Sequence, residues 1–173
     1  MTVRYSVLAG VYLLALIGRG LYEWLKEHHR VDPTRRLIFA IVFADMALMW
    51  ASWFGMSELD PMRMGLSPLV RWAGLALSVL GLLLFLGALF QLRALENTKE
   101  LVTNGLFALT RHPIYLGFVL WLLGWPLFQD AGASLCLAAP GITAVLSWRR
   151  NEERALRIQF GAAYREYEQR TWF

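Results

Sequence analysis

The sequence contains very little cysteine, since Cys136 is the sole cysteine among 173 residues. One cysteine excludes an intrachain disulfide framework and any metal site built from several thiolates. Charged side chains are also scarce: they make up 17% of the chain, against about a quarter in ordinary soluble domains. Hydrophobic residues make up 57%, and the mean hydropathy is +0.43. This balance excludes an ordinary soluble domain and indicates a chain that lies mostly in lipid.

Several catalytic signatures are missing as well. The sequence has no glycine-rich phosphate-binding loop, no nucleophile elbow of the form G-x-S-x-G and no H-E-x-x-H zinc helix. We interpret His28 and His29, which fall in a basic segment, as solvated surface residues rather than metal ligands. The basic residues are dispersed around apolar segments, so we expect no nucleic-acid partner.

Five apolar runs are present, each near or somewhat below the roughly 20 residues that span a bilayer as a helix. They cover Tyr5–Gly18, Leu37–Phe54, Trp72–Leu92, Ile114–Phe128 and Ala131–Trp148. Backbone polar groups in lipid must be satisfied within the segment, which favours helices. Only Gln129 and Asp130 separate the last two runs, so we expect a tight helical hairpin there. The prediction is an all-α, polytopic membrane bundle of about five transmembrane helices.

The basic residues predict the orientation of this bundle. Most of them follow the first, third and fifth runs: Lys26, Arg30, Arg35, Arg36, Arg93, Lys99, Arg111, Arg149, Arg150, Arg154, Arg157, Arg165 and Arg170. The other side receives Arg4, Arg63 and Arg71. By the positive-inside rule, the N-terminus is outside and the C-terminus is in the cytoplasm. The net charge of +4 fits a cytoplasmic face close to anionic lipid.

Residues 110–117, reading TRHPIYLG, begin the fourth run on the cytoplasmic side. Pro113 suits the first turn of a helix, where its missing N–H costs nothing, and it favours an extended His112 just outside. His112 and the free N–H groups of the helix start would then converge on a spot that favours an anionic group. The alternative is an ordinary helix end, anchored at the membrane interface by Arg111 and Tyr115.

The preceding connection, LENTKELVTNGLFALTR, carries a turn signal at Asn104–Gly105 with apolar residues on both sides. These residues either cap the bundle against water or form a wall for a flat, partly apolar ligand. Asp45, midway along the second run, leaves two readings open: a functional ionisable group or a structural hydrogen bond to a neighbouring helix.

The segment after the fifth run is amphipathic, with Leu156, Phe160, Ala163, Tyr164 and Tyr167 at helical spacing. We expect an amphipathic helix on the cytoplasmic surface, with i, i+4 ion pairs such as Glu153–Arg157 and Glu166–Arg170. The adjacent acids Glu152 and Glu153 follow the membrane run beside Arg149 and Arg150. Charges in such a position tend to be functional.

Taken in order, the segments LVTNGLF, RHPIYLG, NEERAL and FGAAYREY resemble the isoprenylcysteine carboxyl methyltransferase family, in particular its bacterial members, and the related phospholipid N-methyltransferases. The resemblance covers roughly Lys99 to Arg170. It implies S-adenosylmethionine as cofactor, held at the cytoplasmic end of the bundle. It also implies one membrane domain, with three helices in residues 1–92 and a cofactor-binding methyltransferase core in residues 93–173.

The resemblance implies roles for particular residues. The positions that match cofactor-contacting residues of the family are Lys99, Glu100, Leu101, Val102, Phe107, His112, Pro113, Tyr115 and Glu152. Glu152 would receive the methionyl amine, and His112 with the helix start would receive the methionyl carboxylate. Arg149 or Arg150 would orient the acceptor. The family usually has tyrosine at position 107 and an arginine where Trp148 stands.

The predicted function is therefore methylation of a lipophilic acceptor, first a carboxylate on an isoprenylcysteine-like or other lipid molecule. Alternatives are a phospholipid N-methyltransferase, a reductase similar to the membrane sterol reductases that uses NADPH, and a non-catalytic membrane accessory protein. The expected location is a bacterial inner membrane, with lipids as neighbours and the site facing the cytoplasm.

Overall fold

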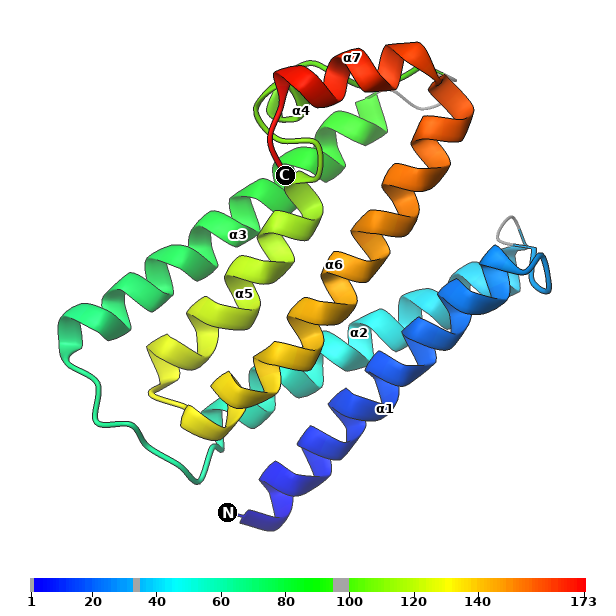
Figure 1. The fold of residues 1–173 in the computed structure, drawn as a ribbon. Helices are drawn as coiled ribbons and strands as arrows, with labels where there is room; N and C mark the ends of the chain where they lie inside the picture. Colours follow the sequence, from blue (N-terminus) through cyan, green and yellow to red (C-terminus); the bar gives the residue numbers. More distant parts are fainter. Residues whose placement is uncertain (1, 33–34, 95–99) are drawn as a thin grey trace.

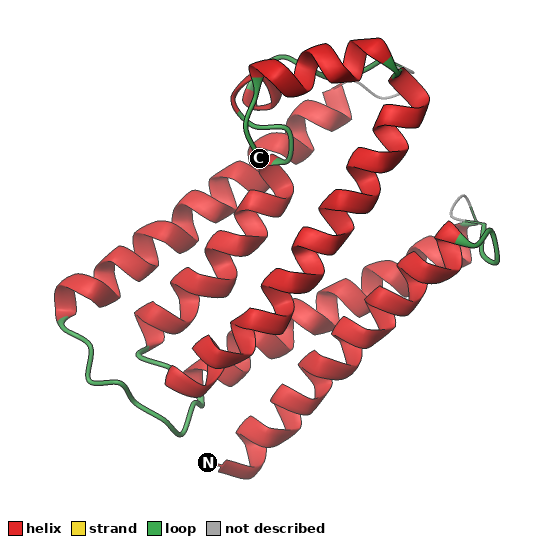
Figure 2. Cartoon of the chain, in the orientation of Figure 1, coloured by secondary structure: helices red, strands yellow, loops and turns green. Residues whose placement is uncertain are grey.

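The computed structural model describes residues 2–32, 35–94 and 100–173, and within them the chain is helical apart from its connecting segments (Figures 1 and 2). The helices are α1 (Thr2–Glu27), α2 (Arg36–Glu58), α3 (Pro68–Ala94), α4 (Leu106–Leu109), α5 (Pro113–Gln129), α6 (Gly132–Phe160) and α7 (Ala162–Arg170). The described residues form no β-strand beyond two isolated bridges. The predicted all-α class is confirmed.

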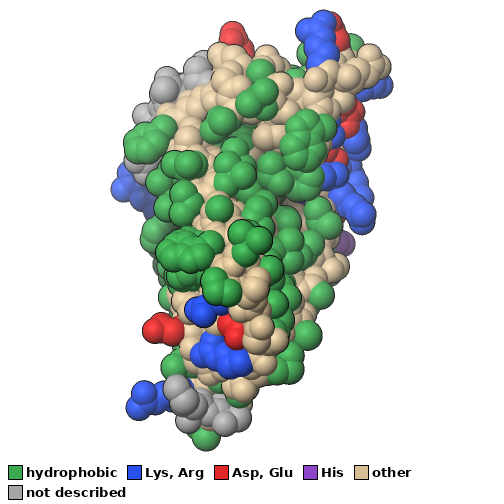
Figure 3. Space-filling view, turned by 90° about the vertical axis from the view of Figure 1, so that its left-hand side faces the viewer, with side chains coloured by type: hydrophobic (Ala, Val, Ile, Leu, Met, Phe, Trp, Pro, Cys, Tyr) green, Lys and Arg blue, Asp and Glu red, His purple; other side chains and the backbone are tan. Residues whose placement is uncertain are grey.

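Each of the five apolar runs lies within one long helix: α1, α2, α3, α5 or α6. Three helices, α1 to α3, are long and apolar enough to cross a membrane, whereas α5 is apolar but has only 17 residues. On the face shown in Figure 3, hydrophobic side chains cover the middle and charged side chains lie toward the two ends. This distribution fits an integral membrane protein.

The predicted hairpin of α5 and α6 is confirmed. Asp130 adopts a left-handed conformation (φ 58°, ψ 40°), and the Ala131 N–H donates to the Pro126 carbonyl at 2.8 Å. The Asp130 carboxylate accepts backbone N–H bonds from Gly65 and Leu66 in the α2–α3 connection, at 3.2 and 3.0 Å. The two connections at this end of the bundle are therefore fixed to each other.

Helices α3 and α5 lie closest together, because glycines face each other along their contact. A Cβ atom built on Gly74 or Gly81 would lie 2.7 Å from the carbonyl oxygen of Gly124 or Gly117, and the reverse distances are 2.6 Å. No real side chain fits at such distances, so only glycine permits this approach of the two backbones. Small residues serve the same purpose at helix contacts in membranes generally.

Helices α1 and α2 form an antiparallel pair beside α6 (Figure 1). Tyr12 of α1 and Trp53 of α2 are almost fully buried, with ring centroids 4.9 Å apart. Trp50 extends this aromatic core toward α5, with its ring 4.9 Å from that of Phe118. The pair is thus attached to the rest of the bundle mainly through large aromatic side chains.

The prediction of a separate amphipathic helix after the fifth run is wrong in one respect. Helix α6 continues without a break from Gly132 to Phe160, so the first half of the amphipathic segment belongs to the membrane helix. Residues 149–160 contain neither proline nor glycine, and nothing in them ends a helix. The chain turns only at Gly161, which has a positive φ of 55°, and α7 then runs back across the end of the bundle (Figure 1).

Candidate active site

The start of α5 has part of the predicted form. Pro113 occupies the first turn and His112 lies outside the helix, as predicted, but the ψ of His112 is 61° (φ −130°), so its backbone is not extended as expected. The His112 side chain is buried, with 4% of its surface exposed. Its Nε2 lies 3.3 Å from Glu153 Oε1, and its ring centroid lies 5.6 Å from that of Tyr115.

Glu153 is buried within a group of basic side chains. Its carboxylate lies 3.4 Å from an Arg111 guanidinium nitrogen, 3.7 Å from Arg149 Nε and 3.8 Å from Arg157 Nη2. Burial lowers the pKa of His112, and the charges of Arg149 and Arg111 lower it further, although Glu153 opposes them. His112 is therefore neutral at pH 7 and can donate one ring N–H.

The last residues of the chain lie against the start of α5. The backbone N–H groups of Arg111 and His112 donate to the carbonyls of Trp172 and Phe173, at 3.3 and 3.2 Å. The Arg149 guanidinium lies over the Phe173 ring, 4.7 Å from its centroid. The next residue of α6, Arg150, is exposed. The end of the chain is thus paired with the backbone immediately before the first turn of α5.

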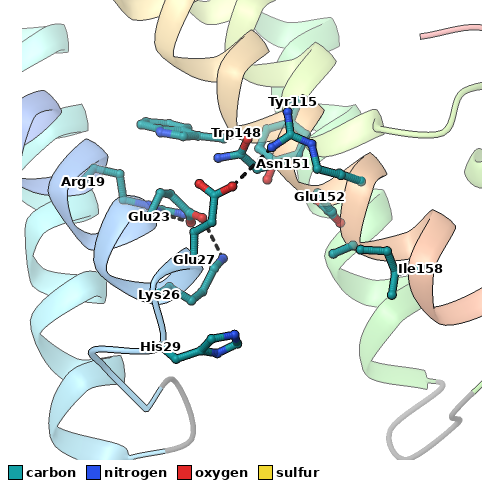
Figure 4. Close-up of a pocket in the computed structure, with 12 residues that line it drawn as sticks. Arg19, Glu23, Lys26, Glu27, His29, Tyr115, Trp148, Asn151, Glu152 and Ile158 are labelled. Carbon is teal, nitrogen blue, oxygen red and sulfur yellow. Dashed lines mark hydrogen bonds and ion pairs between the residues drawn. The ribbon is translucent and has the colours of Figure 1, made fainter.

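A cavity of about 470 Å³ opens between the C-terminal part of α1, the start of α5 and the second half of α6 (Figure 4). Tyr115 and Glu152, both predicted cofactor residues, line it together with Trp148. The other lining residues are Arg19, Glu23, Lys26, Glu27, His29, Asn151, Arg154, Ala155 and Ile158. Arg149 and Arg150 are not among these lining residues.

Glu152 projects into this cavity from α6 (Figure 4). The surrounding protein withdraws water from its carboxyl and raises its pKa, while a hydrogen bond from the Tyr115 hydroxyl and the charge of Lys26 act in the opposite direction. Across the cavity, Glu27 of α1 accepts a hydrogen bond from Arg154 of α6 at 3.2 Å. The acid thus faces a cavity of mixed charge, with an aromatic ring beside it.

The loop before α5 makes the predicted turn at Asn104–Gly105, where Gly105 has a φ of 57°. The Gln91 side chain of α3 fixes this turn: it donates to the Asn104 carbonyl at 2.7 Å and accepts from the Leu106 N–H at 3.1 Å. The turn is held to α3 rather than suspended in solvent.

The cofactor residues predicted from this loop lie apart from the cavity. Leu101 lines a separate hollow of about 390 Å³ against α7, and the Phe107 carbonyl accepts a hydrogen bond from the Tyr167 hydroxyl at 2.5 Å. Glu100 is exposed and Val102 is half-buried. Lys99 lies outside the described residues. The structure therefore brings Tyr115 and Glu152 together in the cavity, places His112 next to Tyr115 but outside the cavity lining, and separates the described loop residues from it.

The sequence reading missed two groups of residues at this end. Glu153 was expected to pair with Arg157 and to lie beside Arg149 and Arg150, but its burial against Arg111 and His112 was not predicted. The motifs do not indicate Arg19, although Arg19, Glu23 and Lys26 recur at i, i+4 and i+7 after the first apolar run. That spacing places all three on one helix face and could have indicated a polar surface on α1.

Comparison with known families decides the relationship. The sequence model of the phospholipid methyltransferase family matches residues 69–163, more than half of the chain. The chain belongs to this family. Within the phospholipid methyltransferase family match lie α3, α5, α6 and the cavity residues Tyr115, Trp148 and Glu152. Helices α1 and α2, with Arg19, lie outside it.

Curated relatives resemble a smaller part of this phospholipid methyltransferase family member. A probable protein-S-isoprenylcysteine O-methyltransferase of Oryza sativa is 37% identical over 84 residues, which cover 44% of this chain and 40% of the relative. The human protein-S-isoprenylcysteine O-methyltransferase is 34% identical over 83 residues, covering 44% and 27%. The matched part of the chain thus spans two fifths or less of these relatives. No solved structure matches the chain.

Proposed function

We propose that this protein is an integral membrane methyltransferase that uses S-adenosylmethionine and acts on a lipophilic carboxylate. The observation that carries the proposal is the cavity at the end of α1, α5 and α6, where Glu152, Tyr115 and Trp148 meet. Its volume of about 470 Å³ falls within the range of small-molecule sites, about 300–1,000 Å³.

The residues of this cavity suit the cofactor. Aromatic faces attract cations, so Tyr115 and Trp148 provide a surface for a sulfonium group. The Glu152 carboxylate would hold the methionyl amine through a charge-assisted hydrogen bond. The neutral His112, behind Tyr115, has one ring N–H with which to donate to the methionyl carboxylate. We place Pro113 with these residues because it fixes the position of His112, and we retain Lys99 to Val102 and Phe107 as cofactor residues from the family resemblance.

When bound, the cofactor supplies an electrophilic methyl group: an acceptor oxygen forms the new bond to carbon, and the electron pair of the broken carbon–sulfur bond stays on sulfur. The protein contributes mainly position, because holding two reactants in line removes several kcal/mol from a barrier. A carboxylate acceptor is ionised at neutral pH. The site then needs a cation to orient the acceptor and needs no general base.

The acceptor class rests on the relatives. Those described above carry the name protein-S-isoprenylcysteine O-methyltransferase, which denotes methylation of an oxygen on a prenylated cysteine. The sequence offers Arg149 or Arg150 as the orienting cation. The description of the matching family favours a second candidate, a phospholipid amine acceptor.

We further propose a bacterial inner membrane location with the N-terminus outside, so that the cavity opens to the cytoplasm and its soluble cofactor.

The proposal is tested by calorimetric titration of the detergent-purified protein with S-adenosylhomocysteine. We expect micromolar binding, weakened at least tenfold, about 1.4 kcal/mol, in Glu152→Gln and in His112→Ala. Glu58→Gln is the matched control, because Glu58 is exposed and contributes no side chain to the cavity. Unchanged thermal unfolding would show that the variants are folded.

Absence of binding by the native protein would contradict the proposal. Binding of NADPH in its place would support the reductase alternative, and binding of neither ligand would support a non-catalytic role. Equal affinity of Glu152→Gln and the native protein would reject the assigned site while leaving the activity to be explained elsewhere.

A further inference from the structure

Two cavities meet at one side chain of α1. The cavity described above contains charged residues from α1 and α6, whereas a second cavity of about 230 Å³ lies between α1 and α2 and is almost entirely apolar. Arg19 lines both of them. The second cavity is otherwise lined by Gly18, Leu21, Tyr22, Leu25, Val31, Ile38, Ile41, Val42 and Asp45. A molecule with an apolar chain and a charged end could therefore extend from one cavity to the other past Arg19.

The apolar cavity is accessible from the lipid side. Leu21 and Ile41 line it and are 53% and 56% exposed. Exposed leucine and isoleucine on membrane helices face the hydrocarbon of the bilayer. An acyl or prenyl chain can thus move from the bilayer into the cavity without crossing water.

The Arg19 guanidinium is held in a defined position. Its central carbon lies 4.8 Å from the centroid of the Trp148 ring and 5.1 Å from that of the Tyr22 ring. Its Nη1 donates a hydrogen bond to Glu23 Oε1 at 2.5 Å; Arg19, Glu23 and Trp148 are labelled in Figure 4. Arginine stacks well on aromatic rings because its guanidinium is planar and weakly hydrated. Only 13% of the side chain is exposed.

Arg19 nevertheless has hydrogen-bonding capacity left. Its Nε is buried and has no hydrogen-bond partner among the described residues. A buried donor without a partner is costly, and native proteins rarely leave one unless something else binds there. The charge is not fully compensated either, because Glu23 is shared with Lys26, whose Nζ lies 2.7 Å from its second oxygen.

The other ionisable group in reach is Asp45 of α2. Its Oδ1 lies 3.0 Å from the point where a Cβ on Gly18 would stand, and its Oδ2 is buried without a hydrogen-bond partner. Asp45 lines only the apolar cavity, whereas Arg19 also faces the cavity of Glu152 and Tyr115. A group held by Arg19 is therefore nearer to the proposed cofactor than a group held by Asp45, which favours an anionic end on the ligand.

We propose that Arg19 binds the carboxylate of the lipophilic acceptor, while the acceptor's hydrocarbon chain lies in the apolar cavity between α1 and α2. This inference rests on the proposed function. The Trp148 ring of α6 supports this arginine of α1, whose guanidinium carbon lies 4.8 Å from the ring centroid. Arg149, directed to Phe173, and the exposed Arg150 then have no direct contact with the acceptor.

The test is direct binding of paired probes to the native protein in detergent, measured by calorimetry. The probes are N-acetyl-S-farnesylcysteine, its carboxamide and S-farnesylcysteamine, which present a carboxylate, a neutral amide and an amine on the same chain. We expect the acid to bind at least tenfold more tightly than the amide. Arg19→Gln should remove this preference, and Arg19→Lys should retain part of it. Arg165→Gln is the matched control and should leave the preference unchanged, because Arg165 is exposed on α7 and lines neither cavity.

S-adenosylhomocysteine affinity, measured in the same variants, separates this inference from the proposed function. We expect it to stay within twofold in Arg19→Gln. A preference for the acid without any cofactor binding would support the acceptor site and reject the methyltransferase. The inference is overturned if native protein does not prefer the acid, if Arg19→Gln keeps the preference, or if Arg19→Gln loses cofactor affinity to the same extent. It is also overturned if the amine binds best and Asp45→Asn abolishes that binding.

Discussion

The helix pair α3–α5 and the helix pair α1–α2 are both antiparallel neighbours, but they are joined by different means. In α3–α5, two facing glycine pairs, Gly74–Gly124 and Gly81–Gly117, bring the two backbones into contact. In α1–α2, large aromatic residues such as Tyr12 and Trp53 fill one half of the contact, and a cavity of about 230 Å³ remains in the other half. At these glycines the first pair packs backbone against backbone, whereas the second pair has room beside Arg19.

This difference corresponds to a division of roles. The α3–α5 pair lies within the range of the family match and carries His112 and Tyr115 at the start of α5. The α1–α2 pair lies outside the family match and contains the apolar cavity proposed for the hydrocarbon chain of the acceptor. We infer that close packing supports the common cofactor chemistry, and that the looser pair is where acceptor preference can vary between relatives.

The largest stability effect is expected at Glu153 of α6, which is buried against His112 at the start of α5. Glu153→Gln leaves the partly buried Arg111 and Arg149 without the buried carboxylate, and breaking a buried ion pair in this way costs about 3–5 kcal/mol. Glu166→Gln is the matched control, since Glu166 forms an exposed pair with Arg170. Unfolding by SDS in mixed micelles measures both. Equal unfolding free energies of the two variants would show that Glu153 is not buried as described.

Alanine substitution of glycine should change the stability of the protein in α5 but not in α1. Gly117→Ala places a methyl group against the Gly81 backbone, and overpacking of this kind costs about 1–3 kcal/mol. Gly10→Ala on α1 meets nothing within 4 Å and should leave the stability unchanged or slightly higher. The same unfolding measurement applies. A similar loss in both variants would contradict the contrast between the pairs.

Acid should lower the folding stability of the protein through His112, which immediately precedes α5. Because burial lowers the pKa of His112, the unfolded chain binds a proton at this residue below about pH 6.5 while the folded chain still does not. Stability then falls as the pH drops below that value, and the loss is complete once the pH is below the folded pKa. The native protein should therefore show a steeper decline in stability below pH 6.5 than His112→Gln. Parallel pH profiles would reject the buried, neutral histidine.

The smallest effect is expected between α1 and α6, at the cavity that Glu152 and Tyr115 line. Glu27→Gln removes the ion pair with Arg154, whose two side chains are at least half exposed. Exposed pairs contribute about 0–1 kcal/mol, so the unfolding free energy should change by less than that amount. A larger loss would mean that this ion pair contributes strongly to holding α1 against α6. It would contradict the attachment of the α1–α2 pair mainly through aromatic side chains.

Local signals in the sequence predicted most of the fold. Pro113 indicated the start of α5, Asn104–Gly105 indicated the turn before it, and the short Gln129–Asp130 connection indicated the hairpin. Each of these depends on the backbone preferences of a few neighbouring residues. The continuity of α6 past Trp148 follows from the same kind of rule, the absence of proline and glycine, and could have been predicted.

The site was less predictable because its contacts join distant segments. The motif residues Tyr115 and Glu152 were correctly expected to lie at one end of the bundle, and they share a cavity. The burial of Glu153 depends on Arg111 and His112, some forty residues earlier in the chain, and no local pattern indicates it. Arg19 reaches Trp148 across more than a hundred residues.

The unbroken course of α6 sets the height of Glu152 and, with it, the depth at which the proposed reaction would take place. The twelve residues from Arg149 to Phe160 extend the helix by about 18 Å beyond the apolar run, at 1.5 Å per residue. Glu152 lies within the first turn of this extension, so its height is fixed relative to the hydrocarbon boundary. We expect bilayer thickness to affect turnover: vesicles of longer-chain lipids should draw the site toward the hydrocarbon and those of shorter-chain lipids should expose it. Acceptors would accordingly be selected by how far their reactive end stands above the membrane as well as by their shape.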